Sequence, residues 1–152
     1  MSIVFVVDSM LGNVSKWLRI LGYETLFLKI PSDEALLRLS QENNRILLTS
    51  DEELFKKAKS RGVATIFINP NLSLKEKLVK VFKESNLQPQ LNSTRCTVCG
   101  GELNKIEIDD LKEFLFTSDF WVCKKCGKLY WKGSHWKNIM KMYEELCKEL
   151  NT

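Results

Sequence analysis

The sequence predicts an α/β fold: a parallel sheet with helices on both faces, followed by a small domain built on four cysteines and a C-terminal helix. Two observations carry this prediction. Strand-like and helix-like segments alternate four times before residue 85, which is the pattern of a parallel sheet joined by helical crossovers. Two C-x-x-C-G motifs follow, and cysteines paired at this spacing are typical of a small metal-binding domain.

Four short apolar runs predict the strands of the sheet. They cover residues 3–7, 25–28, 45–49 and 64–68. The first run, IVFVV, is apolar throughout, as expected for a strand that is buried on both faces.

A helix is expected after each strand. The first presents Val14, Trp17, Leu18 and Leu21 as one apolar stripe and ends at Gly22. The second covers about residues 33–43. The third runs to about Ser60 and should begin at a capping box formed by Ser50 and Glu53. The fourth covers about 74–84, and a last helix is expected over 136–150.

The composition changes after residue 85, where the polar stretch SNLQPQLNST is typical of a linker. We therefore expect three units. These are a sheet domain over residues 1–88, a cysteine-containing domain over 94–134 and a C-terminal helix over 135–152.

Length and composition narrow the class of protein. The 152 residues are 44% hydrophobic and 28% charged, which is ordinary globular usage and excludes a largely disordered chain. The sequence has no apolar run of membrane-spanning length and no basic, apolar leader at its start, so we expect a cytoplasmic protein without membrane contact. In that compartment, cysteines are metal ligands or free thiols more often than disulfides. Cys147, on the last helix, is expected to be a core thiol.

The most specific signal is the pair of cysteine motifs. Cys96, Cys99, Cys123 and Cys126 form two C-x-x-C-G knuckles, and each glycine permits the tight turn around a metal. Two such knuckles complete a tetrahedral site with no open position, so we predict a structural zinc ion in a zinc ribbon. A redox role is the alternative, but redox motifs occur singly at a helix N-terminus.

Acidic residues follow three of the predicted strands. Asp8 follows the first, Asp33 the second and Asp51 the third. Because the ends of parallel strands share one edge of the sheet, the three carboxylates are expected to converge there. Clustered carboxylates repel one another unless a cation neutralises them, and oxygen ligands suit Mg²⁺ or Mn²⁺. Such an ion can activate water for phosphodiester cleavage.

Each of these acids also has a simpler interpretation. Asp33 and Asp51 each stand at the start of a helix, where the helix dipole favours an acid in any protein, and Asp8 can cap the first helix. The occurrence of three acids at successive strand ends is what favours a metal site over three separate caps.

The C-terminal part is basic and aromatic. From Lys124 to the end there are seven lysines against three glutamates, with Tyr130, Trp131 and Trp136 among them. This pattern is typical of a nucleic-acid surface, and a solvated lysine face is the alternative. The two tryptophans can stack on unpaired bases or pack the ribbon onto the sheet domain. His135 can contact phosphate, although a structural role is the simpler interpretation.

Several stretches together resemble a known family. FVVDSMLGNVSKWLRILGYET, DEAL, RILLTSDEEL, the two knuckles and LYWKGSHWKNI occur in this order. The chain resembles, over nearly its whole length, the Mut7-C RNase domain family, which joins a PIN-like nuclease domain to a zinc ribbon. The sequence departs from the family at Asn13, Lys16 and Ser50, where basic residues or arginine are common.

The resemblance implies a PIN-like fold and a metal-dependent nuclease that acts on RNA, with single-stranded DNA as the alternative substrate. Asp8, Asp33 and Asp51 match its acidic positions, and the four cysteines match its ribbon ligands. We expect those acids to be catalytic and to bind magnesium or manganese. Substrate contacts are expected from Lys16, Arg19, Lys132 and His135.

Other classes of protein fit less well. The alternative function is a non-catalytic module whose ribbon binds RNA or a protein while the α/β domain is a scaffold. A phosphorelay receiver would need paired acids after the first strand, and a haloacid-dehalogenase phosphatase would need a D-x-D motif. Asp8 is instead followed by Ser9 and Met10.

Overall fold

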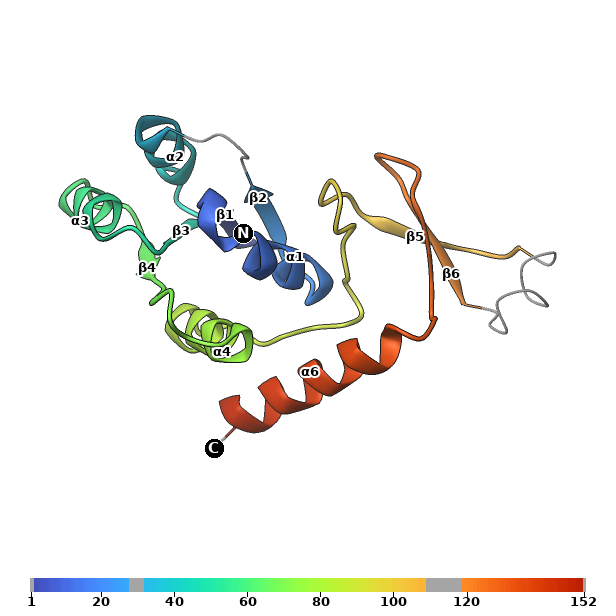
Figure 1. Ribbon diagram of the computed structural model, residues 1–152. Coiled ribbons are helices and arrows are strands. Elements are labelled where there is room, and N and C mark those ends of the chain that lie inside the picture. The colour runs from blue at the N-terminus through green and yellow to red at the C-terminus, as the bar shows by residue number, and fades with distance from the viewer. Residues whose placement is uncertain (1, 28–31, 109–118, 152) are drawn as a thin grey trace.

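The computed structural model describes residues 2–27, 32–108 and 119–151 of the chain (Figure 1). Its first sheet contains β1 (Val4–Val7), β2 (Glu24–Phe27), β3 (Arg45–Thr49) and β4 (Thr65–Phe67). All neighbouring strands are parallel, in the order β2-β1-β3-β4. The predicted fold class is therefore confirmed.

Helices cover both faces of this sheet, as predicted. The helices α1 (Gly12–Ile20) and α4 (Leu74–Ser85) bury apolar side chains against one face, together with Phe5 and Val7 of β1. On the other face, α2 (Asp33–Ser40) and α3 (Glu52–Ser60) pack against Val6 and Leu47. The alternation of Val6 with its two neighbours follows from the two-residue period of a strand.

Several boundaries differ from the prediction: three of the four strands of the first sheet begin or end one residue away from it, and the helices differ as follows. A short 3-10 helix, η1 (Ser9–Leu11), precedes α1, and α2 ends three residues before the predicted position 43. The predicted capping box at Ser50 is wrong, since Asp51 is the N-cap of α3 and the Ser50 hydroxyl donates to the Ile68 carbonyl. Residue 28, predicted as the end of the second strand, lies outside the described residues.

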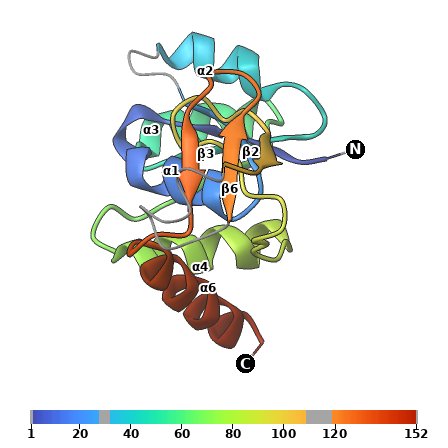
Figure 2. The ribbon, with the colours of Figure 1, turned by 90° about the vertical axis from the view of Figure 1, so that its right-hand side faces the viewer.

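The second sheet lies in the part of the chain that is predicted to be a zinc ribbon. It contains β5 (Leu103–Ile106), β6 (Phe120–Cys123) and β7 (Leu129–Trp131), which pair antiparallel in that order. Figure 2 shows its strands in front of the parallel sheet domain.

The C-terminal helix α6 (Trp136–Leu150) returns to the first domain and lies beside α4, as Figures 1 and 2 both show. Leu146 is fully buried in the same core as α1 and α4, so the helix shares that core. Hydrogen bonds also fix the connection after α4 to the end of α1. The Gln90 amide donates to the Leu21 carbonyl and the Thr94 hydroxyl to the Ile20 carbonyl, so both domains meet at the end of α1.

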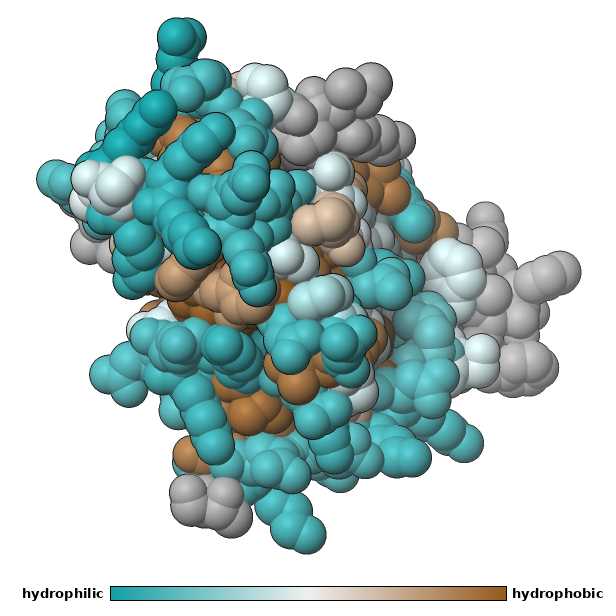
Figure 3. Space-filling view, turned by 60° about the vertical axis from the view of Figure 1, so that its left-hand side comes forward, coloured by the Kyte–Doolittle hydropathy of each residue, from teal (hydrophilic) through white to brown (hydrophobic). Residues whose placement is uncertain are grey.

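The surface agrees with ordinary globular composition. Figure 3 shows a face dominated by hydrophilic side chains, with hydrophobic residues confined to small patches between them. Across the described parts of the chain, no helix combines the length and the apolar character that crossing a membrane requires.

Candidate functional site

The two cysteine knuckles have the same backbone geometry. The Gly100 amide donates to the Cys96 carbonyl (2.8 Å), and the Gly127 amide donates to the Cys123 carbonyl (3.0 Å). Both glycines have positive φ angles, +78° and +79°, which residues with a Cβ adopt only at a cost in energy. The glycines therefore close the turns that bring each pair of cysteines together.

The four thiols form one compact group. The ligand atoms of Cys96, Cys99, Cys123 and Cys126 all lie within 4.8 Å of one another. The Sγ atoms of Cys96 and Cys126 are 3.7 Å apart, and those of Cys99 and Cys123 are 3.5 Å apart. A tetrahedral zinc site with ~2.3 Å bonds has S–S edges of about 3.8 Å. The predicted convergence is confirmed, and both the spacing and the all-sulfur donor set fit structural zinc.

Hydrogen bonds favour the thiolate form of Cys96, which is the form that binds a metal. Burial alone would raise the pKa of Cys96, but the Tyr130 hydroxyl and the Cys99 and Val98 amides donate to its sulfur and lower the pKa to about 6. The Tyr130 oxygen lies 3.0 Å from Cys96 Sγ and accepts from the Thr97 amide. The sequence does not indicate that Tyr130 belongs to the cysteine site, because only the tertiary fold places β7 beside the first knuckle.

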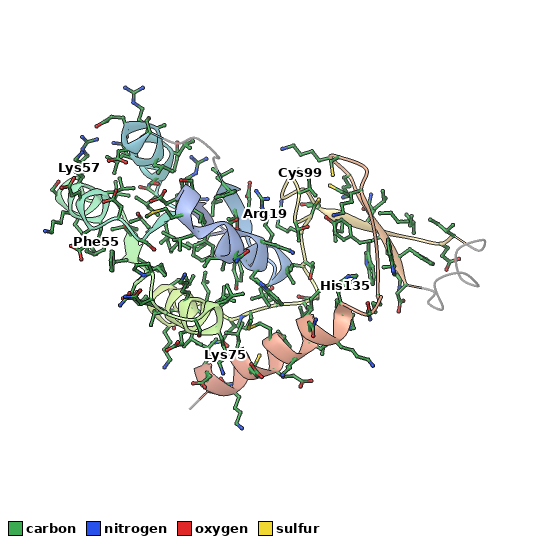
Figure 4. The ribbon with its side chains drawn as sticks, in the orientation of Figure 1. Arg19, Phe55, Lys57, Lys75, Cys99 and His135 are labelled. Atoms are coloured by element: carbon green, nitrogen blue, oxygen red, sulfur yellow. The ribbon has the colours of Figure 1, made fainter. Side chains whose placement is uncertain are left out.

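Arg19 lies buried beside the cysteine group. It is 8% exposed, and its guanidinium donates to the Thr25 carbonyl (2.9 Å) and to the Thr97 carbonyl (3.1 Å). Figure 4 shows it between α1 and the loop that carries Cys99. Burial lowers the pKa of Arg19, and the nearby thiolates Cys99 and Cys96 oppose that shift.

Four thiolates around Zn²⁺ carry a net negative charge, so a cation beside them is stabilised. Through these two hydrogen bonds, Arg19 joins β2 to the first knuckle. Its predicted contact with the substrate backbone finds no support in this placement.

Asp8 lies at the end of β1, at the edge of the parallel sheet. It is 7% exposed, and its Oδ2 accepts a hydrogen bond from the Thr49 hydroxyl at the end of β3 (2.8 Å). The Asp8 side chain makes no capping hydrogen bond to the helix that follows. Asp8 therefore occupies the N-cap position of η1 without capping it through its side chain, and its carboxylate is turned toward the neighbouring strand.

Asp51 is joined to Asp8 through Thr49. The Asp51 amide donates to the Thr49 hydroxyl oxygen (3.0 Å). The Asp51 side chain also caps α3, since its Oδ1 accepts from the Glu53 and Leu54 amides (2.9 and 3.2 Å). The capping interpretation of Asp51 is thus confirmed, and both cap bonds use the same carboxylate oxygen.

Asp33 lies apart from these two acids. It is the first residue of α2, whose cap is Ser32, and its Oδ2 lies 3.8 Å from Lys57 Nζ on α3. Within residues 2–27, 32–108 and 119–151, the cysteines are the only group of three or more acids, histidines or cysteines close enough to hold one metal ion. The structure thus links Asp8 to Asp51 but does not bring Asp33 into contact with them.

The position of the linked pair is the one where α/β proteins bind ligands. In the order β2-β1-β3-β4, the chain leaves β1 toward one side of the sheet and later builds β3 and β4 on the other side. Ligands bind at this switch point, beyond the carboxyl ends of the two central strands. Asp8 directly follows one of those strands, Thr49 ends the other, and Asp51 lies two residues beyond it.

A second feature lies between the domains. A cavity of about 540 Å³ is lined by α1, the connection before the first knuckle, the ribbon and the start of α6. Lys16 and His135 line it, and Figure 4 shows His135 where the chain enters α6. Lys132 Nζ lies 5.9 Å from the ring centre of Trp121 and 5.0 Å from that of Trp136, and both rings line the cavity.

Of the four residues predicted to contact substrate, Lys16 and His135 line this cavity, Lys132 lies beside two of its rings, and Arg19 does not line it. The sequence indicated the residue types, but only the packing of the ribbon on α1 makes them neighbours.

Comparison with known proteins adds one finding. The family model described as "Mut7-C RNAse domain" matches residues 3–143, which is nearly the whole chain. No curated protein and no solved structure matches the chain.

Proposed function

Because the chain belongs to the Mut7-C RNAse domain family, we propose that it is a metal-dependent ribonuclease that hydrolyses phosphodiester bonds of RNA. The observation that carries this proposal is the buried carboxylate of Asp8, linked through Thr49 to Asp51 at the switch point of the sheet. Zinc in the ribbon is structural in this proposal, since four thiolates leave no open position.

The donor set at the sheet edge suits a hard cation. Asp8 and Asp51 supply carboxylate oxygens, which are the preferred ligands of Mg²⁺ and Mn²⁺. Asp51 caps α3 with Oδ1, so the same side chain can offer Oδ2 to an ion. Asp33 is proposed as a third acid that moves toward the site. Its ion pair with Lys57 is long and half exposed, so breaking that pair costs little.

The roles of the residues follow from their placement. A divalent ion held here supplies an activated water and offsets charge on the phosphate. Thr49 holds the carboxylate of Asp8 in one orientation through its hydroxyl, so the site is ordered before an ion binds. Lys16, exposed on α1, is proposed to hold the RNA backbone, and the ribbon lysines add non-specific affinity.

A cleavage assay tests the proposal. Zinc-loaded protein is incubated with labelled single-stranded RNA and DNA, with Mg²⁺ or Mn²⁺, beside the variants Asp8→Asn and Asp51→Asn. Both variants keep an oxygen for the hydrogen bonds of the parent residue, so the fold should survive while metal binding is lost. We expect metal-dependent RNA cleavage in the parent protein and a loss of at least ~100-fold in each variant.

Two controls separate this outcome from unfolding. Glu42→Gln removes an exposed acid that precedes the amino end of β3, at the opposite edge of the sheet from Asp8 and Asp51, and should cleave like the parent. Zinc content and Tm should be unchanged in the acid variants. Cleavage that survives in Asp8→Asn would contradict the assignment of the site.

A specific observation keeps a second function under test. Asp51 is already explained as a helix cap. The cavity between the domains is basic and aromatic, and none of the three acids lines it. A non-catalytic RNA-binding module would show RNA binding with no cleavage by any variant. Chelators are unsuitable for this test because they strip the zinc and unfold the ribbon.

A further inference from the structure

We propose that the cavity between α1, the ribbon and α6 binds an unpaired nucleobase of single-stranded RNA, with the flanking phosphates held by Lys16 and Lys132. This inference rests on the proposed function only for the identity of the ligand as RNA. It adds a subsite that lies away from the carboxylate edge.

Three of the aromatic rings that line the cavity are not used to build either core of the sheet domain. Trp121, Trp131 and Trp136 are each partly exposed, and neither hydrophobic core described for the sheet domain includes them. Apolar rings of this size that remain accessible inside a cavity mark a binding site. The observed volume of about 540 Å³ falls within the usual range of small-ligand sites.

The backbone holds two of these rings at the wall of the cavity. The Gly133 amide donates to the Trp131 carbonyl and the Trp136 amide donates to the Gly133 carbonyl, both at 3.0 Å. A Cβ on Gly133 would lie 2.8 Å from Trp131 Nε1, so this indole packs directly against the turn. The rings are therefore positioned before any ligand arrives, which reduces the entropy lost on binding.

The charges around the cavity favour an anion. Lys16, Arg95 and Lys128 line it, and among the described residues its lining contains no acid. Lys132 lies over the ring of Trp136 and also 3.8 Å from Asp119 Oδ2, with its side chain 39% exposed. When a base stacks on the ring of Trp136, the ammonium of Lys132 can move from that ring to the adjacent phosphate.

Aromatic rings beside cations are the features that bind single strands. Bases stack on the rings whatever their sequence, and lysines follow the backbone. A base inside a duplex is already stacked and cannot enter a concave site. The nearest part of α1 to the cavity is its second half, whereas Asp8 precedes its first residue. The subsite therefore lies toward the opposite end of that helix from the carboxylate edge.

Fluorescence anisotropy without added Mg²⁺ or Mn²⁺ tests the proposal. The probes are a labelled single-stranded RNA 12-mer and the same sequence as a duplex. We expect Trp136→Ala to weaken single-strand binding roughly 5- to 100-fold, as loss of one stacked base does. Trp136→Phe keeps a ring and should retain most of the affinity, which separates stacking from a folding defect.

The lysine variants have a matched control. Lys16→Ala and Lys132→Ala should each weaken binding several-fold and reduce the salt dependence by about one unit of slope. Lys141→Ala removes the same charge from an exposed position on α6 outside the cavity lining and should have a smaller effect.

The outcomes separate this inference from the proposed function. Single-strand binding that needs Trp136 in a protein that cleaves nothing would support the subsite and overturn the nuclease. Cleavage with Trp136→Ala binding like the parent would overturn the subsite alone. Equal loss of duplex binding in Trp136→Ala, or no RNA binding by the parent, would also overturn it and leave the cavity for a protein ligand.

Discussion

The cysteine group and the carboxylate edge are both predicted metal sites, but the fold brings their ligands together to different extents. The four sulfurs of the ribbon lie within 4.8 Å of one another. At the sheet edge, Asp8 and Asp51 are joined through Thr49, while Asp33 pairs with Lys57 on another helix. The cysteines pair within two tight turns, whereas the acids come from three separate connections. Local spacing forms each half of the cysteine site, and the antiparallel pairing of β5 with β6 completes it, whereas the parallel sheet assembles the carboxylate site in part.

The largest expected effect comes from breaking the assembled site. Cys123→Ser should remove zinc and unfold the ribbon, because structural zinc contributes on the order of 10 kcal/mol to folding of small domains. Zinc content and limited proteolysis measure this loss. Cys147→Ser changes the one cysteine outside the knuckles and should keep both zinc and fold. Intact zinc in Cys123→Ser would show that the group is not the metal site.

A smaller effect is expected at Arg19, which joins the ribbon to the sheet domain. Arg19→Ala leaves the Thr25 and Thr97 carbonyls without their charged donor and should lower the free energy of unfolding by about 2–4 kcal/mol. Arg19→Lys should recover little, since lysine lacks the fork that reaches both carbonyls. Thermal unfolding measures the change, with the exposed Arg38→Ala as control. Equal stability of the two alanine variants would contradict the joining role.

The hydroxyl that connects the two acids can be removed alone. Thr49→Val should cost about 1–2 kcal/mol of stability and also reduce metal-dependent cleavage, because Asp8 loses its fixed orientation. Thr65→Val is the matched control, since Thr65 is also buried but donates to the Leu47 carbonyl. Similar stability loss in both variants, with cleavage lost only in Thr49→Val, is the expected result. Equal activity would separate Thr49 from the site.

The smallest effect on stability is expected at Asp33. Its ion pair with Lys57 is exposed, so Asp33→Asn and Lys57→Ala should each change stability by less than about 0.5 kcal/mol. Cleavage then sharpens the comparison. Loss of activity in Asp33→Asn but not in Lys57→Ala would place Asp33 with the other two acids during the reaction. Parent-like activity in both variants would show that the carboxylate site consists of Asp8 and Asp51 without Asp33.

Much of this protein could be predicted from local pattern. The strand over residues 45–49 and the helix over 136–150 have the predicted bounds, because apolar periodicity alone identifies them. The cap of α3 could not be predicted as well. Ser50 and Asp51 are both good capping residues, and the choice depends on the Ile68 carbonyl, which takes the Ser50 hydroxyl.

The sequence by itself determined the two classes of ligand and where each falls on the chain. The spacing and the glycines determine each knuckle locally, but the two knuckles meet only because β5 pairs with β6. Only the tertiary structure decided that Arg19 is buried beside the ribbon, that Thr49 links Asp8 to Asp51, and that Lys16 meets His135 at one cavity. These contacts join residues far apart in sequence, so their geometry depends on how the sheet, the ribbon and the last helix pack together.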